Sequence, residues 1–161
     1  MIQNIYQILD TNNIEYEKYE HEPVFTVEEA DEIKTCIKGA HTKNLFLKNK
    51  NASQYFLYVI ASHKRADLKS VKDQIGESKP QFGTPEELME HLGVTPGSVS
   101  VLGLIHDTQH RVQVLIDKEL WDAELVNAHP NTNTATLVFT QDNFRKFLEV
   151  TRHKSIIVEA Q

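Results

Sequence analysis

The clearest pattern of hydrophobic and polar residues lies in the first half of the chain. An apolar stretch at residues 43–48 and a β-prone stretch at residues 54–61 are separated by the polar residues 49–53. Two such stretches around a polar turn predict a β-hairpin. Lys43 and Asn44 then open its first strand, where a cation held by rigid sheet is suited to binding an anion or a carbonyl group. A lysine at a solvated strand edge is the alternative.

Apolar residues with helical spacing recur along the chain. The predicted helices and helical turns are residues 2–11, 26–37, 66–75, 84–92 and 118–121, with a last helix that follows Thr140 or Asp142. The helix that follows Thr84 has a strong start signal, because Pro85 occupies its first turn and Glu87 completes a capping box with Thr84.

The other β-prone segments are residues 14–19, 81–83, 98–105, 111–117, 125–128, 135–140 and 155–158. His106 and His110 lie between two of these segments, and we interpret them as flanking a hairpin tip rather than as a pair of metal ligands. Helices and strands are mixed without a repeat or strict alternation. The pattern predicts an α/β (α+β) fold over residues 1–161, a single compact domain with a mixed or largely antiparallel, barrel-like sheet surrounded by helices.

The 161 residues carry a formal net charge of −6, but the charge is unevenly distributed. Residues 34–79 contain ten lysine or arginine and three acidic residues, a net charge of +7, which leaves −13 for the remainder. Such asymmetry indicates one face for a polyanion and a repelling surface elsewhere. Chance clustering of charges on solvated faces is the other explanation.

Several classes of protein are disfavoured by what the sequence lacks. One cysteine permits no internal disulfide, and no secretory signal or membrane-spanning apolar run is seen, so we expect a cytoplasmic protein that does not bind membranes. Cys36 lies among apolar residues and is interpreted as a buried, inert thiol. No metal-binding motif, phosphate-binding glycine loop or serine nucleophile motif occurs, so we expect no metal and no cofactor.

What remains is a set of residues without a common catalytic motif. It consists of Lys43 and Asn44, the glycines Gly97 and Gly103, and His129. Glycine permits close approach of a ligand to the backbone, and backbone N–H groups can stabilise an oxyanion. A histidine that precedes a proline is held extended and can line a pocket, although an ordinary loop histidine is the alternative.

Four segments together resemble the YbaK/EbsC-like family of aminoacyl-tRNA deacylases, and within it the free-standing prolyl-tRNA editing proteins. They are Gly-Ala-His-Thr-Lys-Asn-Leu-Phe-Leu at 39–47, Gly-Val-Thr-Pro-Gly-Ser-Val-Ser at 93–100 with Gly103, His-Pro-Asn-Thr-Asn-Thr-Ala-Thr at 129–136, and Phe-Arg-Lys-Phe-Leu-Glu-Val-Thr at 144–151. The resemblance covers nearly the whole chain. The family often has Pro-Phe where this chain has Val101 and Leu102, and a bulky residue in place of Ala128.

The resemblance implies hydrolysis of alanine mischarged onto proline tRNA, since lysine followed by asparagine is similar to the alanine-specific branch. Deacylation of cysteinyl- or seryl-tRNA is the alternative within the family. A neighbouring ribose hydroxyl would help to activate or position water, so the protein would need only to orient the substrate and stabilise the oxyanion. The implied partners are the acceptor end of mischarged tRNA and, transiently, prolyl-tRNA synthetase or an elongation factor.

Site residues are implied in the same way. The expected catalytic residues are Lys43, Asn44, Gly97, Ser98 and Gly103, and the expected substrate-binding residues are Thr42, His129, Pro130, Lys48, Lys50, Lys64 and Arg65. The lysine would hold a phosphate or the ester carbonyl, and the asparagine the ribose or the α-amino group. Two other function classes stay open: a tRNA- or synthetase-binding module without catalysis, and a hydrolase of another small ester.

Overall fold

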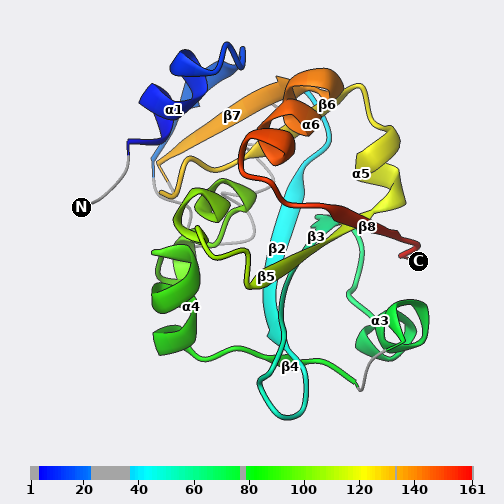
Figure 1. The fold of residues 1–161 in the computed structure, drawn as a ribbon. Coiled ribbons are helices and arrows are strands. Elements are labelled where there is room, and N and C mark those ends of the chain that lie inside the picture. The colour runs from blue at the N-terminus through cyan, green and yellow to red at the C-terminus, as the bar shows by residue number, and fades with distance from the viewer. Residues whose placement is uncertain (1–3, 23–36, 77–78, 133, 161) are drawn as a thin grey trace.

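The computed structural model describes residues 4–22, 37–76, 79–132 and 134–160, which form two β-sheets flanked by helices (Figure 1). A five-stranded mixed sheet has the order β4-β2-β3-β5-β8, and a three-stranded antiparallel sheet has the order β1-β7-β6. The strands are β1 (Glu17–Glu20), β2 (Thr42–Lys48), β3 (Tyr55–Ala61), β4 (Gln81–Phe82), β5 (Val112–Asp117), β6 (Leu125–Ala128), β7 (Ala135–Thr140) and β8 (Ser155–Val158).

The expected mixed α/β architecture is confirmed, and so is the central hairpin. β2 and β3 pair antiparallel with Lys48 opposite Tyr55, whereas β3–β5 and β5–β8 are parallel pairs. A single parallel bridge between Ala40 and Val126 joins the two sheets. Neither sheet closes on itself in the described ranges, so the barrel-like description applies only loosely.

Five α-helices are found in the described ranges, and α4 and α6 begin at predicted caps. They are α1 (Ile5–Thr11), α3 (Leu68–Ile75), α4 (Pro85–Leu92), α5 (Lys118–Asp122) and α6 (Gln141–Val150). Thr84 and Glu87 form the predicted capping box of α4, and Thr140, not Asp142, caps α6. Residues 23–36 lie outside the described residues. They include Cys36 and all but the last residue of the helix predicted for residues 26–37. No helix in the described ranges has the length and hydrophobicity to cross a bilayer.

The strand predicted for residues 98–105 is wrong. This stretch forms two 3-10 helices, η1 (Pro96–Ser98) and η2 (Val101–His106), and all but the last residue of η2 is buried. The Ser100 hydroxyl accepts a hydrogen bond from the Leu102 amide (3.1 Å) and starts η2. An apolar run that is buried on every side has no face to distinguish strand from helix by periodicity.

The hairpin tip predicted between His106 and His110 is also wrong. β5 has only parallel neighbours, so no strand precedes it across a tight turn. The turn is shaped instead by the buried Asp107 carboxylate, which accepts hydrogen bonds from the amides of Arg111 (3.0 Å) and Val112 (2.9 Å).

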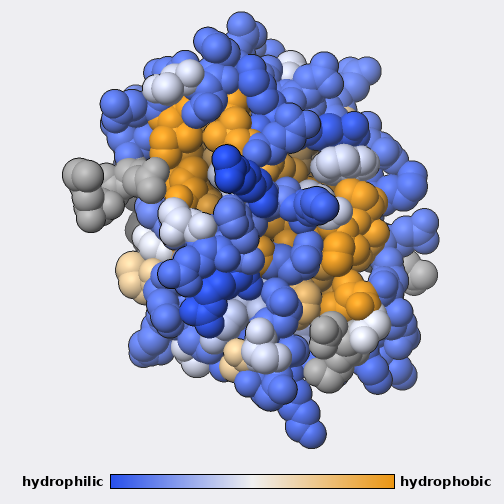
Figure 2. Space-filling view, in the orientation of Figure 1, coloured by the Kyte–Doolittle hydropathy of each residue, from blue (hydrophilic) through white to orange (hydrophobic). Residues whose placement is uncertain are grey.

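The five-stranded sheet separates two hydrophobic cores. On β2, Phe46 faces the larger core, which includes α4, η2, α6 and β7, whereas Leu45 and Leu47 face the smaller core, which includes α3. Every residue of β3 is buried because both of its faces are covered. The surface is largely hydrophilic, with hydrophobic atoms exposed near the end of the sheet formed by β8, where Ile156 and Ile157 are partly exposed (Figure 2).

Candidate functional site

The candidate site is built where the first residues of β2 meet β6. The Thr42 hydroxyl donates to the main-chain oxygen of Asn127 on β6 (3.0 Å). Asn44 lies two positions further along β2 and therefore on the same face as Thr42, whereas Lys43 leaves the strand on the opposite face. The two residues that the sequence places side by side thus serve different surfaces.

The loop after β6 is tied to the 3-10 helices. The Ser100 hydroxyl donates to the main-chain oxygen of His129. Gly103 packs against the end of α4, since a Cβ atom there would lie 3.1 Å from the Leu92 oxygen and 3.7 Å from the Asn131 side-chain oxygen. The glycine therefore favours close packing of η2 on the end of α4, which differs from the close ligand approach expected from the sequence.

His129 is held in one tautomer. Its Nδ1 lies 3.2 Å from the main-chain oxygen of Ala135, and because a carbonyl can only accept, Nδ1 carries the hydrogen. Burial lowers the pKa of His129, an effect that outweighs the Ala135 hydrogen bond and is assisted by His21 and His41. The ring is therefore neutral at pH 7, and Nε2 presents a lone pair that no described residue uses. Pro130, which follows it, is buried.

Three side-chain oxygens at this end of the molecule are buried without a hydrogen-bond partner among the described residues. They belong to Asn44, Asn127 and Asn131. Buried polar atoms in folded proteins are nearly always hydrogen-bonded, so an unpaired acceptor indicates a missing donor. Asn131 also has a left-handed backbone (φ 62°), which asparagine tolerates better than most residues.

Lys43 and the expected backbone donors are partly engaged within the protein. The Lys43 ammonium group donates to the main-chain oxygen of Lys64, in the loop between β3 and α3. The amide of Ser98 donates to the Thr95 oxygen (2.9 Å), and that of Gly103 donates to the Ser100 oxygen (3.0 Å). Of the backbone groups expected to bind an oxyanion, Gly97 remains, exposed in the first turn of η1.

The cations expected to bind tRNA phosphates are dispersed, and two are already paired. Lys48 lies at the far end of β2 and pairs with Glu87 (2.8 Å), and Lys64 pairs with the fully buried Asp117 (3.0 Å). Lys50 lies in the exposed turn between β2 and β3, and Arg65 is exposed beside Lys64. The structure therefore does not bring Lys48 or Lys64 to a free phosphate-binding surface.

Sequence reasoning missed the residues that support the site rather than form it. His21 Nε2 accepts a hydrogen bond from the Thr136 hydroxyl (3.0 Å), and its Nδ1 donates to the main-chain oxygen of Glu22 (2.9 Å). His41 Nε2 donates to the Ile37 oxygen (3.0 Å). The signal was present in the number of histidines, but their convergence around His129 depends on contacts between distant segments.

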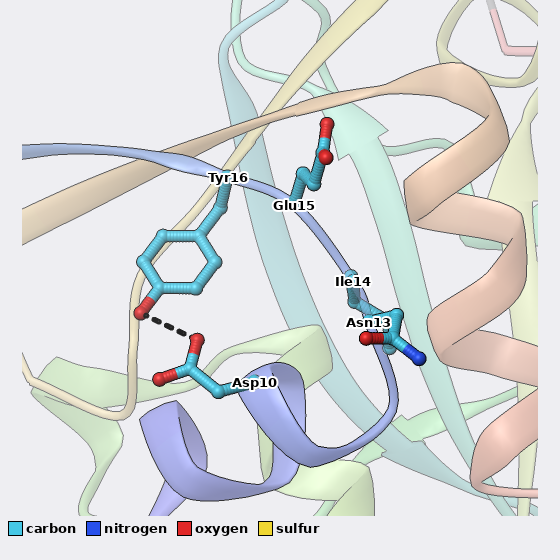
Figure 3. A pocket seen from close by; sticks show the side chains of 5 residues that line it. All are labelled: Asp10, Asn13, Ile14, Glu15 and Tyr16. Carbon is cyan, nitrogen blue, oxygen red and sulfur yellow. Dashed lines mark hydrogen bonds between the residues drawn. The ribbon is translucent and has the colours of Figure 1, made fainter.

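Other features of the described residues do not compete for this role. No group of three or more potential metal ligands is found among them. A hollow of about 630 Å³ lies beside the end of α1 and the start of β1, where the Tyr16 hydroxyl donates to Asp10 (3.4 Å; Figure 3). Its lining consists of Asp10, Asn13, Ile14, Glu15 and Tyr16, and includes none of the predicted site residues.

Comparison with known proteins gives a consistent result. A family model described as the aminoacyl-tRNA editing domain matches residues 21–147. The prolyl-tRNA editing protein ProX of Acetoanaerobium sticklandii is 36% identical over 141 residues, which cover 88% of this chain and 86% of that protein. Prolyl-tRNA synthetase associated domain-containing protein 1 of Danio rerio is 34% identical over 154 residues, with coverage of 94% and 83%.

Solved structures share the fold. One, described as a candidate trans-editing enzyme for prolyl tRNA synthetase, has a TM-score of 0.71 and 21% identity, and the match covers 99% of this chain and 98% of that one. Another, described only as a hypothetical protein, has a TM-score of 0.75 and 19% identity, with coverage of 98% and 99%. At these identities the likeness concerns the fold alone.

Proposed function

The chain belongs to the aminoacyl-tRNA editing domain family, and from this we propose that it is a trans-editing deacylase. Its proposed substrate is alanine esterified to proline tRNA. The observation that carries the proposal is the convergence of three segments: the first residues of β2, the η1–η2 turns and the His129 loop. They are joined by the Thr42–Asn127 and Ser100–His129 hydrogen bonds, and no hydrogen bond within the described residues uses the Asn44 oxygen or His129 Nε2.

The reaction needs positioning more than a protein nucleophile. Water attacks the ester carbonyl carbon, the bond between that carbon and the ribose oxygen breaks, and the ribose oxygen takes up a proton. The neighbouring ribose hydroxyl can activate or position the water. Fixed dipoles in a preorganised site then stabilise the charge that develops on the carbonyl oxygen.

Two side chains on the site face are suited to the aminoacyl end. We assign the buried Asn44 oxygen to the substrate α-ammonium group, because an unpaired acceptor in a desolvated site favours a charged donor. The neutral His129 accepts a hydrogen bond at Nε2 from a ribose hydroxyl or from the attacking water. The exposed Gly97 amide is the proposed donor to the carbonyl oxygen.

Lys43 has a different proposed role because its side chain leaves the other face of β2. Of the two groups a lysine could hold here, the terminal nucleotide's phosphate suits this placement better than the ester carbonyl. An ammonium group has three donors, so the hydrogen bond to the Lys64 oxygen leaves two for a phosphate. The amino acid and the nucleotide would thus be held on opposite sides of one strand.

Discrimination against cognate proline is proposed to be steric. A pocket that admits a methyl group excludes a pyrrolidine ring, and exclusion discriminates more strongly than the roughly 1–3 kcal/mol gained per methylene by contact. Action in trans implies that the protein meets mischarged tRNA after release from prolyl-tRNA synthetase. Serine and cysteine, which are close to alanine in size, are the competing substrates.

A panel of proline tRNAs charged with alanine, serine, cysteine or proline tests the proposal. We expect release of free alanine at the highest rate and no release of proline. Binding of the charged tRNAs without release of any amino acid would indicate a binding module and contradict the proposed deacylase activity. Equal cleavage of a small alanyl ester that lacks tRNA would indicate a hydrolase of another substrate class.

A further inference from the structure

A buried ion pair lies behind the loop that contacts Lys43. Asp117, at the end of β5, is fully buried and uses both carboxylate oxygens. One oxygen accepts the Ala61 amide (3.1 Å), and the other accepts the Lys64 ammonium (3.0 Å) and the Glu119 amide (3.1 Å). The carboxylate therefore fixes the end of β3 and the first turn of α5 against Lys64.

The Lys64 ammonium group is held by partners within the protein. Besides Asp117, it donates to the main-chain oxygen of Ala160 (2.9 Å) and lies 3.5 Å from the Glu119 carboxylate. Only 13% of its side chain is exposed, and its amide donates to the Ala61 oxygen (3.0 Å). Two of its three donors make hydrogen bonds, and a tRNA phosphate would have to compete with two carboxylates for the ammonium group.

The main-chain oxygen of the same residue is the acceptor for Lys43. Side chain and amide together hold Lys64 to β3, β5 and the C-terminal segment, so its carbonyl has a fixed direction. Lys43 contributes a flexible four-carbon stem, whose ammonium would otherwise sample many positions. A preorganised acceptor removes that freedom before a substrate arrives.

We propose that the Asp117–Lys64 pair is a positioning device for Lys43. It orients the Lys64 carbonyl, and this carbonyl places the Lys43 ammonium group where it meets the substrate. The geometric part concerns only this chain, whereas its consequence for catalysis rests on the proposed deacylase function. Asp117 and Lys64 are positioning residues, and neither touches the substrate.

Replacement of Lys64 by methionine tests the geometric part, because it removes the ammonium group but keeps the stem and the carbonyl. The matched control is Lys118→Met, which removes the lysine of a surface pair with Asp122 (2.8 Å) next to Asp117. The readout is the rate at which trace acetic anhydride acetylates Lys43, measured by mass spectrometry of its peptide. We expect an increase of up to about tenfold in Lys64→Met, the limit set by complete loss of a hydrogen bond to a charged group, and none in the control.

Deacylation of alanyl-tRNA tests the consequence. We expect kcat/KM to fall about tenfold in Lys64→Met and to recover in Lys64→Arg. A misplacement of ~1 Å can cost on the order of 10²-fold, and a partial misplacement of Lys43 should cost less. The double variant Lys43→Ala, Lys64→Met should be no less active than Lys43→Ala alone. A thermal melt accompanies each variant. If Lys64→Met does not fold, Lys64→Gln, whose amide can still donate to Asp117, replaces it, with a smaller increase expected.

The two proposals fail in different ways. An unchanged acetylation rate of Lys43 in the folded Lys64 variant would overturn the positioning proposal, whatever the activity. Additive losses in the double variant would overturn it as well, because they would mean that Lys64 acts independently of Lys43. Full deacylation by Lys43→Ala would instead overturn the role of Lys43 in the proposed function, while the acetylation rate would still decide the geometry.

Discussion

The two ends of β2 differ in whether every buried polar side chain has a hydrogen-bond partner. At the Lys48 end, the Glu87 carboxylate accepts from the Lys48 ammonium (2.8 Å), the Tyr55 hydroxyl (2.6 Å) and the Thr84 amide (2.9 Å). At the other end, the Asn44 oxygen is buried without a partner among the described residues. Both ends belong to the same strand of the same sheet, so the difference is not one of fold.

The comparison separates polar groups that stabilise the protein from those available to a ligand. Satisfied groups have their hydrogen bonds in the folded state, and removing one leaves its partners unpaired. Removing an unsatisfied group breaks no hydrogen bond of the folded protein. It does remove a contact to any substrate that supplies the missing partner. Variants at the Lys48 end should therefore change stability, and variants of Asn44 should change activity.

The largest effect is expected from Asn44→Ala. Activity on alanyl-tRNA should fall by roughly 10- to 100-fold in kcat/KM, because a hydrogen bond to a charged group contributes about 1.5–3 kcal/mol. The melting temperature should hardly change, since no described hydrogen bond of Asn44 is lost. Steady-state kinetics and a thermal melt of the same preparation measure both. A loss of stability without a loss of activity would reverse the assignment of this end.

The pH dependence of activity should follow His129. Burial lowers its pKa below the ordinary 6.5, so Nε2 remains an acceptor until the pH falls below that lowered value. Below it, kcat/KM should fall by about tenfold per pH unit as the ring becomes protonated. His129→Asn, whose amide can still donate to Ala135, should flatten this acid limb. An identical limb in the variant would assign the titration to another group.

At the opposite end, Glu87→Gln should lower stability and leave activity unchanged at pH 7. It removes the ion pair with Lys48 but keeps the capping box, since a glutamine oxygen also accepts the Thr84 amide, so the expected loss is about 1 kcal/mol of the free energy of unfolding. Denaturant unfolding at pH 7 measures the difference. Reduced deacylation without reduced stability would contradict the structural role.

Wild type and Glu87→Gln should also differ in how their stability depends on pH. Hydrogen bonds from Lys48, Tyr55 and Thr84 lower the pKa of Glu87 from 4.5 to about 2. Folding thus favours the charged form, and its contribution is complete above pH 4.5 and is lost as the pH falls toward 2. The gap between wild type and Glu87→Gln should be constant from pH 7 to 5 and narrow below 4.5. A gap that widens in acid would have the wrong sign.

Local patterns predicted the elements on which this comparison rests. The hairpin followed from two β-prone stretches around a polar turn, and the start of α4 followed from Thr84 and Glu87. Both depend on residues close in sequence, where periodicity and capping operate. The strand prediction for residues 98–105 failed because the conformation there depends on contacts with Leu92 and the His129 loop. Local propensity carries no information about these contacts.

The composition of the site was harder to predict for the same reason. Lys48 and Lys64 appear as free cations in the sequence because their partners, Glu87 and Asp117, lie 39 and 53 residues away. The alternation of side chains along a strand places Lys43 and Asn44 on opposite faces, whereas the sequence analysis assigned both residues to one site. Sequence thus names candidate residues, but only tertiary contacts distinguish a structural lysine from an available one.

The smallest effect is expected at Arg65, the exposed neighbour of Lys64. Arg65 makes no hydrogen bond or ion pair with the described part of the chain, so a tRNA phosphate could take it at little cost. Lys48 would first have to leave Glu87. Arg65→Ala should therefore lower the slope of log affinity against log salt by about 0.7–0.9, the amount for one phosphate contact, and Lys48→Met should leave the slope unchanged. Binding of uncharged proline tRNA over a salt series measures both slopes, and an equal reduction in the two variants would mean that pairing within the protein does not decide which cations meet the tRNA.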